Sequence, residues 1–435
     1  MQRRFRRMSA WLVRLFGVVA QVAPHERRAV LLAFMCNFAL LGSYYILRPV
    51  RDTVATVIGV GQLQNLFTAT FLGTLLASPV YAMLASRVRL TRLLPGVFWF
   101  WLLNVLLFQL LFRQAPGNVW IAAAYYVWFS VANLFMISVF WSLMVDLFTP
   151  AQATRLFALI AAGGSIGAIA GPVLVRLLVQ RLQLSGLLLL AAAGFLIVIV
   201  LVYRLMHEKQ RLHASHEEVQ ATTLDHQLPG NPFEGFSRLF KSRYIMSQAA
   251  FILLMTWANT VAYFLQTDVI ARAFHAVEGR AQAIADIDLV VNIATALILT
   301  FGLGRLVQRF GVTAGLLLNP LIMLVAFVVV AISPSLIIIQ GLQAVRRIAQ
   351  YAIARPTREI CFTVVEQSSR YKAKNVIDTV IYRFGDVSSA WMQAGLRAAG
   401  FGLGGALTVG IGACIAWGAV ARYAGRRYEE IRSGG

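Results

Sequence analysis

Three groups of charged residues have types and spacings suited to binding an anion or carrying a proton. The first reads Arg48-Pro49-Val50-Arg51-Asp52. At helical spacing Arg48, Arg51 and Asp52 share one face. If a helix continues through Pro49, the arginines are candidates to bind an anion and Asp52 to orient them or couple protons. If Pro49 ends the helix, the charges merely pair in an interfacial loop.

The second group lies on one predicted helical face that holds Gln343, Arg347 and Gln350, with Arg346 beside it. Arginine is always charged and presents a fork of donors to phosphate or carboxylate oxygens, so Arg347 is a candidate anion ligand. In the alternative interpretation, Arg346 and Arg347 only anchor the end of a helix at a boundary with water.

In the third group, Asp378, Tyr382 and Asp386 recur every four residues, and Arg383 precedes Asp386 by three. A carboxylate beside an arginine in a dry helix can carry a proton or meet a substrate, or it can form a structural ion pair. We therefore predict anion binding by Arg383, and coupling or ion pairing by Asp378 and Asp386. Arg176 and the pair Asp288 and Asn292 are predicted to be rim or packing groups.

A glycine-rich stretch, Gly163-Gly164-Ser165-Ile166-Gly167 followed by Gly171-Pro172, is predicted to let two helices approach closely and to bend during a conformational change. Its four glycines are the predicted conformational residues. No Gly-x4-Gly-Lys-Ser/Thr sequence occurs, so we expect no ATP-hydrolysing motor in this chain.

Catalytic and metal-binding patterns are absent from the sequence. No Ser-His-Asp, Cys-His or zinc-protease arrangement is visible, which argues against an enzyme. Four of the six histidines fall within 206–243 without the tight spacing of metal ligands, so we expect neither a metal site nor a cofactor. Cys36, Cys361 and Cys414 are expected to be packing residues.

The composition predicts the elements that position these groups. Of 435 residues, 59% are hydrophobic and 13% charged, which excludes a soluble domain. A membrane-spanning helix needs about 20 apolar residues. Twelve such runs occur, at 29–47, 66–84, 93–111, 119–143, 156–178, 187–205, 244–266, 285–303, 312–332, 335–354, 376–396 and 402–423.

The basic residues predict the orientation of these helices. When Lys and Arg are assigned to the nearest loop, 30 of 39 fall on the side of both termini and 8 on the other, and Arg383 is left inside a helix. Because the excess marks the cytoplasmic side, both termini are predicted to be cytoplasmic. The net charge of +21 is then mostly a topology signal, and no nucleic-acid partner is expected.

The predicted fold is all-α, a polytopic membrane protein with two six-helix halves. These are residues 29–205 and 244–423, joined by a turn-rich cytoplasmic linker, 206–243, and followed by a cytoplasmic tail, 424–435. Residues 1–28 interleave arginines with aromatic and aliphatic residues, as in an interfacial amphipathic helix; a cleaved signal is the alternative. Two such halves are typical of the major facilitator architecture, in which substrate passes between them.

Three stretches resemble the ATP:ADP antiporters of plastids and intracellular bacteria. They are Leu47-Arg48-x-x-Arg51-Asp52, Phe140-Trp141 with Arg155, and Lys372-x-Lys374-x-x-Ile377-Asp378 with Gly385. The resemblance implies a nucleotide exchanger of the major facilitator type. It also implies that Arg51, in place of the family's lysine, helps to hold polyphosphate.

The sequence departs from that family at three places. Asp386 stands where the family has a lysine, and Thr154 where a lysine precedes the arginine matched by Arg155. A carboxylate expected in the fourth helix has no counterpart between Trp128 and Val139. The sequence therefore resembles a divergent branch, and these departures bear on the substrate.

Together these patterns predict a secondary transporter of the inner (plasma) membrane that exchanges nucleotides or a related phosphorylated anion by alternating access. Its partners would be a small anionic solute and the lipid bilayer. One alternative is a proton-coupled transporter of another solute, with Asp386 as the titrating group. A membrane scaffold without transport is the third possibility. The predicted anion ligands are Arg48, Arg51, Arg347 and Arg383, and the predicted coupling or ion-pairing groups are Asp52, Asp378 and Asp386.

Overall fold

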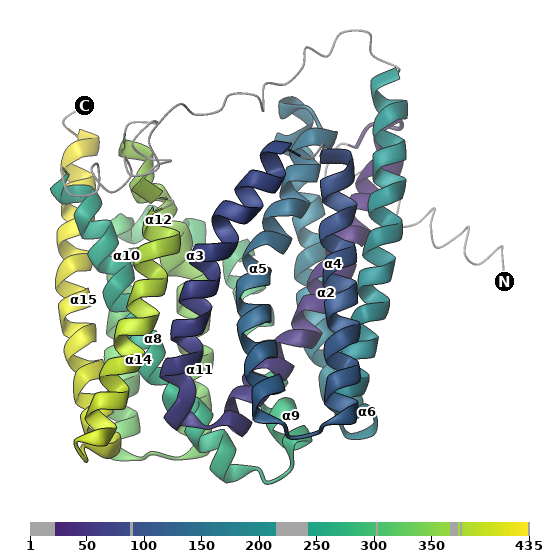
Figure 1. Cartoon of the computed structure of the whole chain (residues 1–435). Coiled ribbons are helices and arrows are strands. Elements are labelled where there is room, and N and C mark those ends of the chain that lie inside the picture. The colour runs from purple at the N-terminus through teal and green to yellow at the C-terminus, as the bar shows by residue number, and fades with distance from the viewer. Residues whose placement is uncertain are drawn as a thin grey trace. The chain divides into compact units, whose positions relative to one another are not determined.

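The computed structural model describes residues 22–87, 90–214, 242–301, 303–365, 373–374 and 376–433. Within these ranges the chain is almost entirely helical, and no strand occurs (Figure 1). Residues 1–21 of the predicted amphipathic segment, and 215–241 of the predicted linker, lie outside the described residues.

The chain divides into two compact units. The first holds Met1–Arg51 and Thr74–Asp225, and the second holds Asp52–Gly73 and His226–Gly435. The segment Asp52–Gly73 joins the end of one helix to the start of the next. The contacts of this segment group it with the second unit, although both helices continue in the first.

Long helices build the first unit, in which α4 packs against α5 and α6. The last of them contains a break, because Gln183 has a φ of 56° and leaves helical geometry there. The break separates the two predicted spans at 156–178 and 187–205. The helices are α2 (Arg27–Ile58), α3 (Leu63–Arg87), α4 (Leu90–Gln114), α5 (Val119–Leu147) and α6 (Pro150–Ala214), with α2 and α3 extending into the second unit.

In the second unit, α8 packs against α11, α14 and α15, and α10 packs against α11 and α15 (Figure 1). Its core includes Phe251 of α8 and Trp417 of α15, whose ring centroids are 5.3 Å apart. The elements are η1 (Val60–Gln62), α8 (Arg243–Ala273), α9 (Val277–Phe301), α10 (Leu303–Ile332), α11 (Leu336–Ala349), η2 (Gln350–Ala354), α12 (Arg355–Cys361), η3 (Phe362–Val364), η4 (Ile377–Ile381), α14 (Tyr382–Ala398) and α15 (Gly402–Ser433).

Eight helical stretches among the described residues are long and apolar enough to cross a membrane. One of them, Arg155–Glu208, has 54 residues and contains the break at Gln183, so it accommodates two predicted spans. The predicted spans at 66–84, 335–354 and 376–396 fall on α3, on α11 with η2, and on η4 with α14. The all-helical polytopic fold is thus confirmed, and the structure is consistent with twelve spans.

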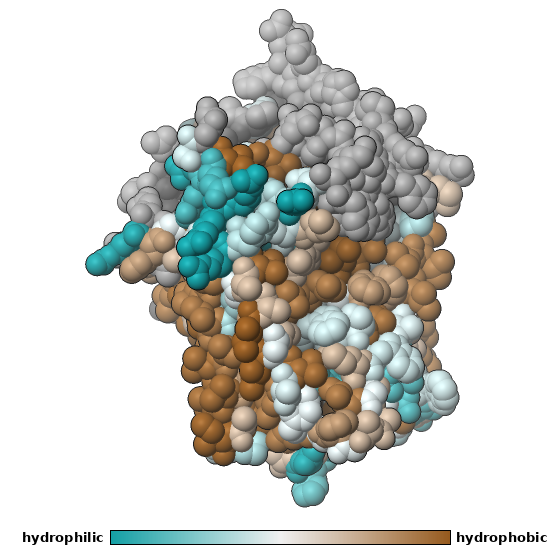
Figure 2. Space-filling view, turned by 90° about the vertical axis from the view of Figure 1, so that its left-hand side faces the viewer, coloured by the Kyte–Doolittle hydropathy of each residue, from teal (hydrophilic) through white to brown (hydrophobic). Residues whose placement is uncertain are grey.

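Apolar side chains dominate much of the described surface in Figure 2, and hydrophilic ones gather toward one end. Large apolar residues are exposed on the described surface: Val325 is 63% exposed and Ile415 is 60% exposed. A contiguous apolar surface would be unstable in water but is stable against lipid hydrocarbon. The chain is a multi-pass membrane protein.

Candidate functional site

Helix α2 runs through Pro49 and ends at Ile58, beyond the predicted end at residue 47. This continuity contradicts the alternative in which Arg48, Arg51 and Asp52 lie in a loop. Proline is tolerated inside such a helix because neighbouring groups compensate for the backbone hydrogen bond that it removes. The first predicted group therefore projects from a regular helix.

In the first unit, aromatic rings hold the two arginines of α2. The guanidinium carbon of Arg51 lies 5.3 Å from the ring centroid of Tyr126 and 5.9 Å from that of Phe129, both on α5. The guanidinium carbon of Arg48 lies 5.6 Å from the ring centroid of Tyr45. Arg51 belongs to the candidate membrane span Arg27–Ile58, and at 1.5 Å per residue Tyr126 lies about 10 Å along α5 from its start.

Helix α5 also fixes the stretch of α2 just before Pro49. The hydroxyl of Tyr125 donates a hydrogen bond of 3.1 Å to the carbonyl oxygen of Leu47. Tyr44 stacks on Phe129, with centroids 5.4 Å apart and ring planes at 17°. Helix α5 therefore holds the backbone of α2 near Arg48 and Arg51 and also supplies the rings beside Arg51.

The four predicted glycines of α6 pack directly against α2. A Cβ atom at any of them would lie under 3.0 Å from an atom of α2, which real Cβ atoms essentially never show. The side-chain amide of Asn37 adds a hydrogen bond of 3.0 Å to the carbonyl oxygen of Ile160. The predicted close approach of two helices is confirmed. The atoms that would be closest belong to Phe34, Asn37, Phe38 and Gly42, opposite Gly163, Gly164, Gly167 and Gly171 respectively.

In the second unit, the polar face of α11 forms a hydrogen-bonded network with α8. Arg346 donates to the side-chain oxygens of Gln343 at 2.9 Å and Gln350 at 3.4 Å. Gln343 donates to the carbonyl oxygen of Ala262 at 2.5 Å, and Asn259 donates to Gln350 at 3.3 Å. The predicted face is present, but Arg346 rather than Arg347 is the arginine that joins it.

Arg347 instead forms a buried ion pair with Asp288 of α9. The guanidinium nitrogen and carboxylate oxygen are 2.5 Å apart, and the two side chains are 4% and 0% exposed. This burial places Arg347 in the interior and contradicts the alternative in which it anchors a helix at a boundary with water. The sequence analysis predicts Asp288 to be only a rim or packing group, and not the partner of Arg347.

The third predicted group divides into two ion pairs. Arg383 and Asp386 of α14 lie 3.6 Å apart, and each side chain is 19% exposed. Asp378 of η4 pairs at 2.6 Å with Arg358 of α12, which is buried and which the sequence analysis missed. Both π-helical turns, η2 and η4, lie beside these polar groups. Single π-turns are frequent at functional sites because they re-aim the side chains that follow.

Tyr382 of α14 lies within electrostatic range of charged residues of both α11 and α14. Asp386, Tyr351, Arg383 and Arg346 all lie close enough to act on it electrostatically. Charged residues from two predicted groups therefore share one polar region of the second unit.

Outside the spans, a buried carboxylate joins the starts of α2 and α6. Glu26 accepts hydrogen bonds from Arg155 at 2.5 Å, Gln152 at 2.7 Å and the backbone of Ala23 at 3.1 Å. Burial alone would raise the pKa of Glu26, but these hydrogen bonds outweigh it and hold the pKa below its ordinary value. Arg155, which the sequence analysis compared with an arginine of the ATP:ADP antiporters, is here a hydrogen-bond partner of Glu26.

Arg176 is exposed and Asn292 of α9 is partly buried. Lys374 pairs with Glu359 at 2.5 Å, and Glu359 also lies 4.0 Å from Arg358, so Lys374 adjoins the Arg358 and Asp378 pair. Lys372 and the histidines at 216 and 226 lie outside the described residues.

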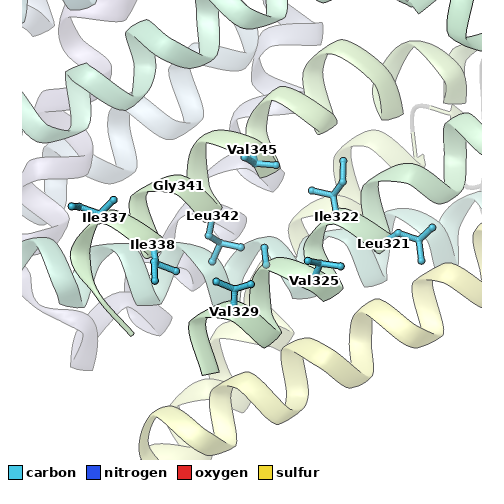
Figure 3. Close-up of a pocket in the computed structure, with 10 residues that line it drawn as sticks. Leu321, Ile322, Val325, Val329, Ile337, Ile338, Gly341, Leu342 and Val345 are labelled. Atoms are coloured by element: carbon cyan, nitrogen blue, oxygen red, sulfur yellow. The ribbon is translucent and has the colours of Figure 1, made fainter. Parts of the chain in front are cut away.

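An apolar cavity of about 620 Å³ lies between α10 and α11 (Figure 3). Side chains of Leu321, Val325, Ile338 and Leu342 line it. It contains no ionisable side chain, so it cannot serve the charge chemistry described above.

Comparisons with known proteins identify the family. The chain matches the Major Facilitator Superfamily model over residues 30–351. A search of curated proteins found no match. Among solved structures, a bacterial homologue of the iron transporter ferroportin in an inward-facing state matches with a TM-score of 0.65 and 14% identity, covering 92% of this chain and 98% of that one.

Two other structures give similar matches. The nucleoside transporter NupG has a TM-score of 0.60 and 13% identity, covering 94% of this chain and 99% of that one. A bacterial homologue of the human lysosomal transporter Spinster has a TM-score of 0.58 and 14% identity, covering 94% of this chain and 99% of that one. At these identities the likeness concerns the fold alone. The match to the family model, which spans most of the sequence, establishes that the chain belongs to the Major Facilitator Superfamily.

Proposed function

We propose that this secondary transporter exchanges nucleotides of the ATP/ADP type, or a related phosphorylated anion, by alternating access. The observation that carries the proposal is the placement of Arg48 and Arg51 on one continuous helix that is long and apolar enough to cross a membrane, with Arg51 over two aromatic rings. An arginine inside a bilayer costs about 2.5 to 3.5 kcal/mol on insertion scales, so such residues usually serve a function.

The geometry suits a phosphorylated ligand. Stacking on a ring uses the face of the guanidinium, whereas phosphate oxygens are bound by the in-plane N–H donors. Residues three apart on a helix are neighbours, so Arg48 and Arg51 can act on one anionic group. Aromatic rings beside them suit a ligand that also carries a flat base.

The resemblance to the ATP:ADP antiporters supports the same substrate class, because Arg51 matches their basic residue in the first helix. The lysine that follows the glycine of the eleventh helix in that family is replaced by Asp386, which here pairs with Arg383. In this proposal Asp52 orients Arg48 and Arg51, and Arg383 supplies positive charge within the second unit when its pair opens. Arg347, held by Asp288, stabilises the second unit rather than touching the anion.

Proton coupling is the second candidate function, and the Arg383 and Asp386 pair favours it. The pair is only partly buried, and its atoms are 3.6 Å apart, so Asp386 is accessible to a proton. Transport with a steep pH dependence that disappears in Asp386→Asn would support this candidate. We place the protein in the inner membrane with both termini in the cytoplasm, on the distribution of Lys and Arg.

Uptake of labelled ATP into liposomes tests the exchange. Purified protein is reconstituted into vesicles preloaded with ADP, with phosphate or with nothing. We expect uptake that requires internal ADP, disappears in Arg51→Ala and partly returns in Arg51→Lys. Arg272→Ala is the matched control, because Arg272 is exposed and pairs with Asp268.

No uptake under any loading, from protein that remains monodisperse, would contradict nucleotide exchange. Uptake that is unchanged by Arg51→Ala would still support nucleotide exchange, but it would contradict binding of the substrate by helix α2.

A further inference from the structure

The apolar cavity between α10 and α11 opens onto the surface of the second unit. Ten residues line it, and none of them has a polar side chain. In Figure 3, Leu342 of α11 and Val329 of α10 lie toward each other across the space. Leu342 is 4% exposed, whereas Ile337 at the rim is 81% exposed. The cavity is therefore a groove with a buried floor and an open side, and we call it the α10–α11 groove.

A glycine on α11 leaves part of this space. Glycine inside a helix costs about 1 kcal/mol relative to alanine, so a conserving reason for it is expected in the packing. At the glycines of α6 that reason is contact with the backbone of α2. A Cβ at Gly341, by contrast, would meet nothing within 4 Å. No neighbour among the described residues requires a glycine there, so the space beside Gly341 can take a group from outside the chain.

The groove runs along two predicted spans. Its α10 wall belongs to the candidate membrane span Arg309–Ile332, and its α11 wall is formed within 337–345. At 1.5 Å per residue, Val329 and Leu321 lie about 5 Å and 17 Å from the end of α10. The connection between the two helices, 333–335, is exposed and contains two serines. The groove thus leads away from a polar connection, in the same way that a lipid chain leads away from its headgroup.

The chemistry of the groove selects its occupant. Apolar cavities stay dry and take apolar ligands. Because no lining side chain is charged or forms hydrogen bonds, a nucleotide or a lipid headgroup would lose its hydration there without compensation. The exposed rim is continuous in kind with the apolar surface that identifies the chain as a membrane protein, so the same hydrocarbon reaches the groove. A second copy of the chain suits it less, since a specific interface takes about 20 to 30 residues a side.

We propose that the α10–α11 groove binds one hydrocarbon chain of a membrane phospholipid. Its volume of about 620 Å³ lies within the range of about 300 to 1,000 Å³ that is usual for small-molecule sites. Lipid tails are as apolar as leucine, so no hydrophobic force drives this binding inside a bilayer. Retention comes from dispersion contacts, which a chain lying along the groove makes with two walls and a floor at once.

The bound chain supports the polar face of α11. Gly341, Leu342 and Val345 face the groove, whereas Gln343 and Arg346 lie on the opposite side of the same helix and join the hydrogen-bonded network with α8. A chain in the groove fills the space behind α11 and so holds its polar face against α8. The inference rests on the membrane fold and does not depend on the substrate proposed above.

Photolabelling in liposomes tests the site. The full-length protein is reconstituted in phosphatidylcholine that contains a small fraction of the same lipid with a diazirine on one chain. Trypsin cuts after Arg309 and Arg346, so both walls lie on one peptide, 310–346; the peptide 398–422, which includes much of α15, is the reference because it also carries exposed apolar residues. We expect about fivefold more label per residue on 310–346, as roughly ten additional atom contacts predict.

Filling the groove should abolish this excess. Gly341→Leu places a side chain in the space, and leucine is the better helix former, so the fold should be preserved. Gly412→Leu on α15 is the matched control, because a Cβ at Gly412 also meets nothing within 4 Å, and it should leave the ratio unchanged. If Gly341→Leu is not monodisperse, Val325→Phe fills the groove from α10 and should have the same effect.

Thermal unfolding in detergent measures the support of α11. Added phosphatidylcholine should raise the unfolding midpoint of the delipidated wild type and of Gly412→Leu, and most of this rise should be lost in Gly341→Leu. Phosphatidylglycerol should act as strongly as phosphatidylcholine, because no charged side chain lines the groove. An effect seen only with phosphatidylglycerol would contradict recognition of the hydrocarbon chain.

Two further results would overturn the inference. Equal label on both peptides, or an excess that survives Gly341→Leu, would mean that the lipid belongs only to the general layer around the protein. A dimer in detergent that Gly341→Leu dissociates would mean that a second copy of the chain covers the groove. Each result can be interpreted whether or not the protein exchanges nucleotides.

Discussion

The arginines of the two units make different contacts. In the first, Arg48 and Arg51 lie over aromatic rings of α2 and α5. In the second, Arg347, Arg358 and Arg383 pair with Asp288, Asp378 and Asp386. A ring face stabilises a cation without cancelling its charge, whereas a carboxylate in contact cancels most of it. Substitutions in the two units should therefore fail in different ways.

The largest effect is expected at Arg347. Arg347→Ala leaves Asp288 buried beside no guanidinium, and removal of one partner of a buried pair costs about 3 to 5 kcal/mol. Thermal unfolding in detergent should show a strongly lowered midpoint. The double variant Arg347→Met with Asp288→Leu should recover most of the loss. A single variant as stable as wild type would mean that the pair does not stabilise the second unit.

Next in size is the close packing of the first unit. Gly167→Ala places a Cβ against the carbonyl oxygen of Phe38, and forced overpacking costs about 1 to 3 kcal/mol. Gly412→Ala in α15 is the control, because a Cβ there meets nothing within 4 Å. If both variants unfold at the same temperature, the first unit does not depend on backbone contact between α2 and α6.

Glu26 tests an ion pair of the first unit that lies outside the spans. Its folded pKa is lowered from the ordinary 4.5, so its stabilisation is present above that value and is lost as pH falls through the folded pKa. Glu26→Gln should be less stable than wild type at neutral pH, by about 1 to 2 kcal/mol, with the difference shrinking toward pH 3. A difference that stays constant between neutral and acid pH would contradict this linkage.

The smallest effect on stability is expected at Arg51. Arg51→Ala should cost about 0.5 to 2 kcal/mol, the strength of a cation on a ring, while abolishing ATP uptake. The comparison with Arg347→Ala is direct, since both remove an arginine from a span. Equal loss of stability in the two variants would mean that the two units do not differ in how they stabilise their arginines.

Hydropathy located the spans because each apolar run must cross the same layer of hydrocarbon. Hydropathy predicted an end for α2 that is too early. The run of apolar residues ends at Leu47, but the helix continues through its charged residues to Ile58. Helix bounds depend on backbone hydrogen bonds, which polar residues make equally well. Hydropathy therefore underestimates any helix whose end carries function.

The ion pairs could not be predicted from the sequence, because they depend on which helices pack together. Periodicity placed Gln343, Arg347 and Gln350 on one face, but adjacent Arg346 reaches that network and Arg347 turns to α9. The π-turn at η2 begins at Gln350 and changes the helical register only from that residue onward. Asp288 and Arg358 had no partner visible in the sequence, since the partners come from other helices.

The glycine seam between α6 and α2 has a mechanical consequence. Side chains that separate two helices can change rotamer, and the helices then slide past each other by small amounts. At Gly163, Gly164, Gly167 and Gly171 there is no side chain on α6 to rearrange. Any force applied to α6 is therefore transmitted to α2 with little slack, and the pair behaves as a single stiff lever that carries Arg48 and Arg51 with it.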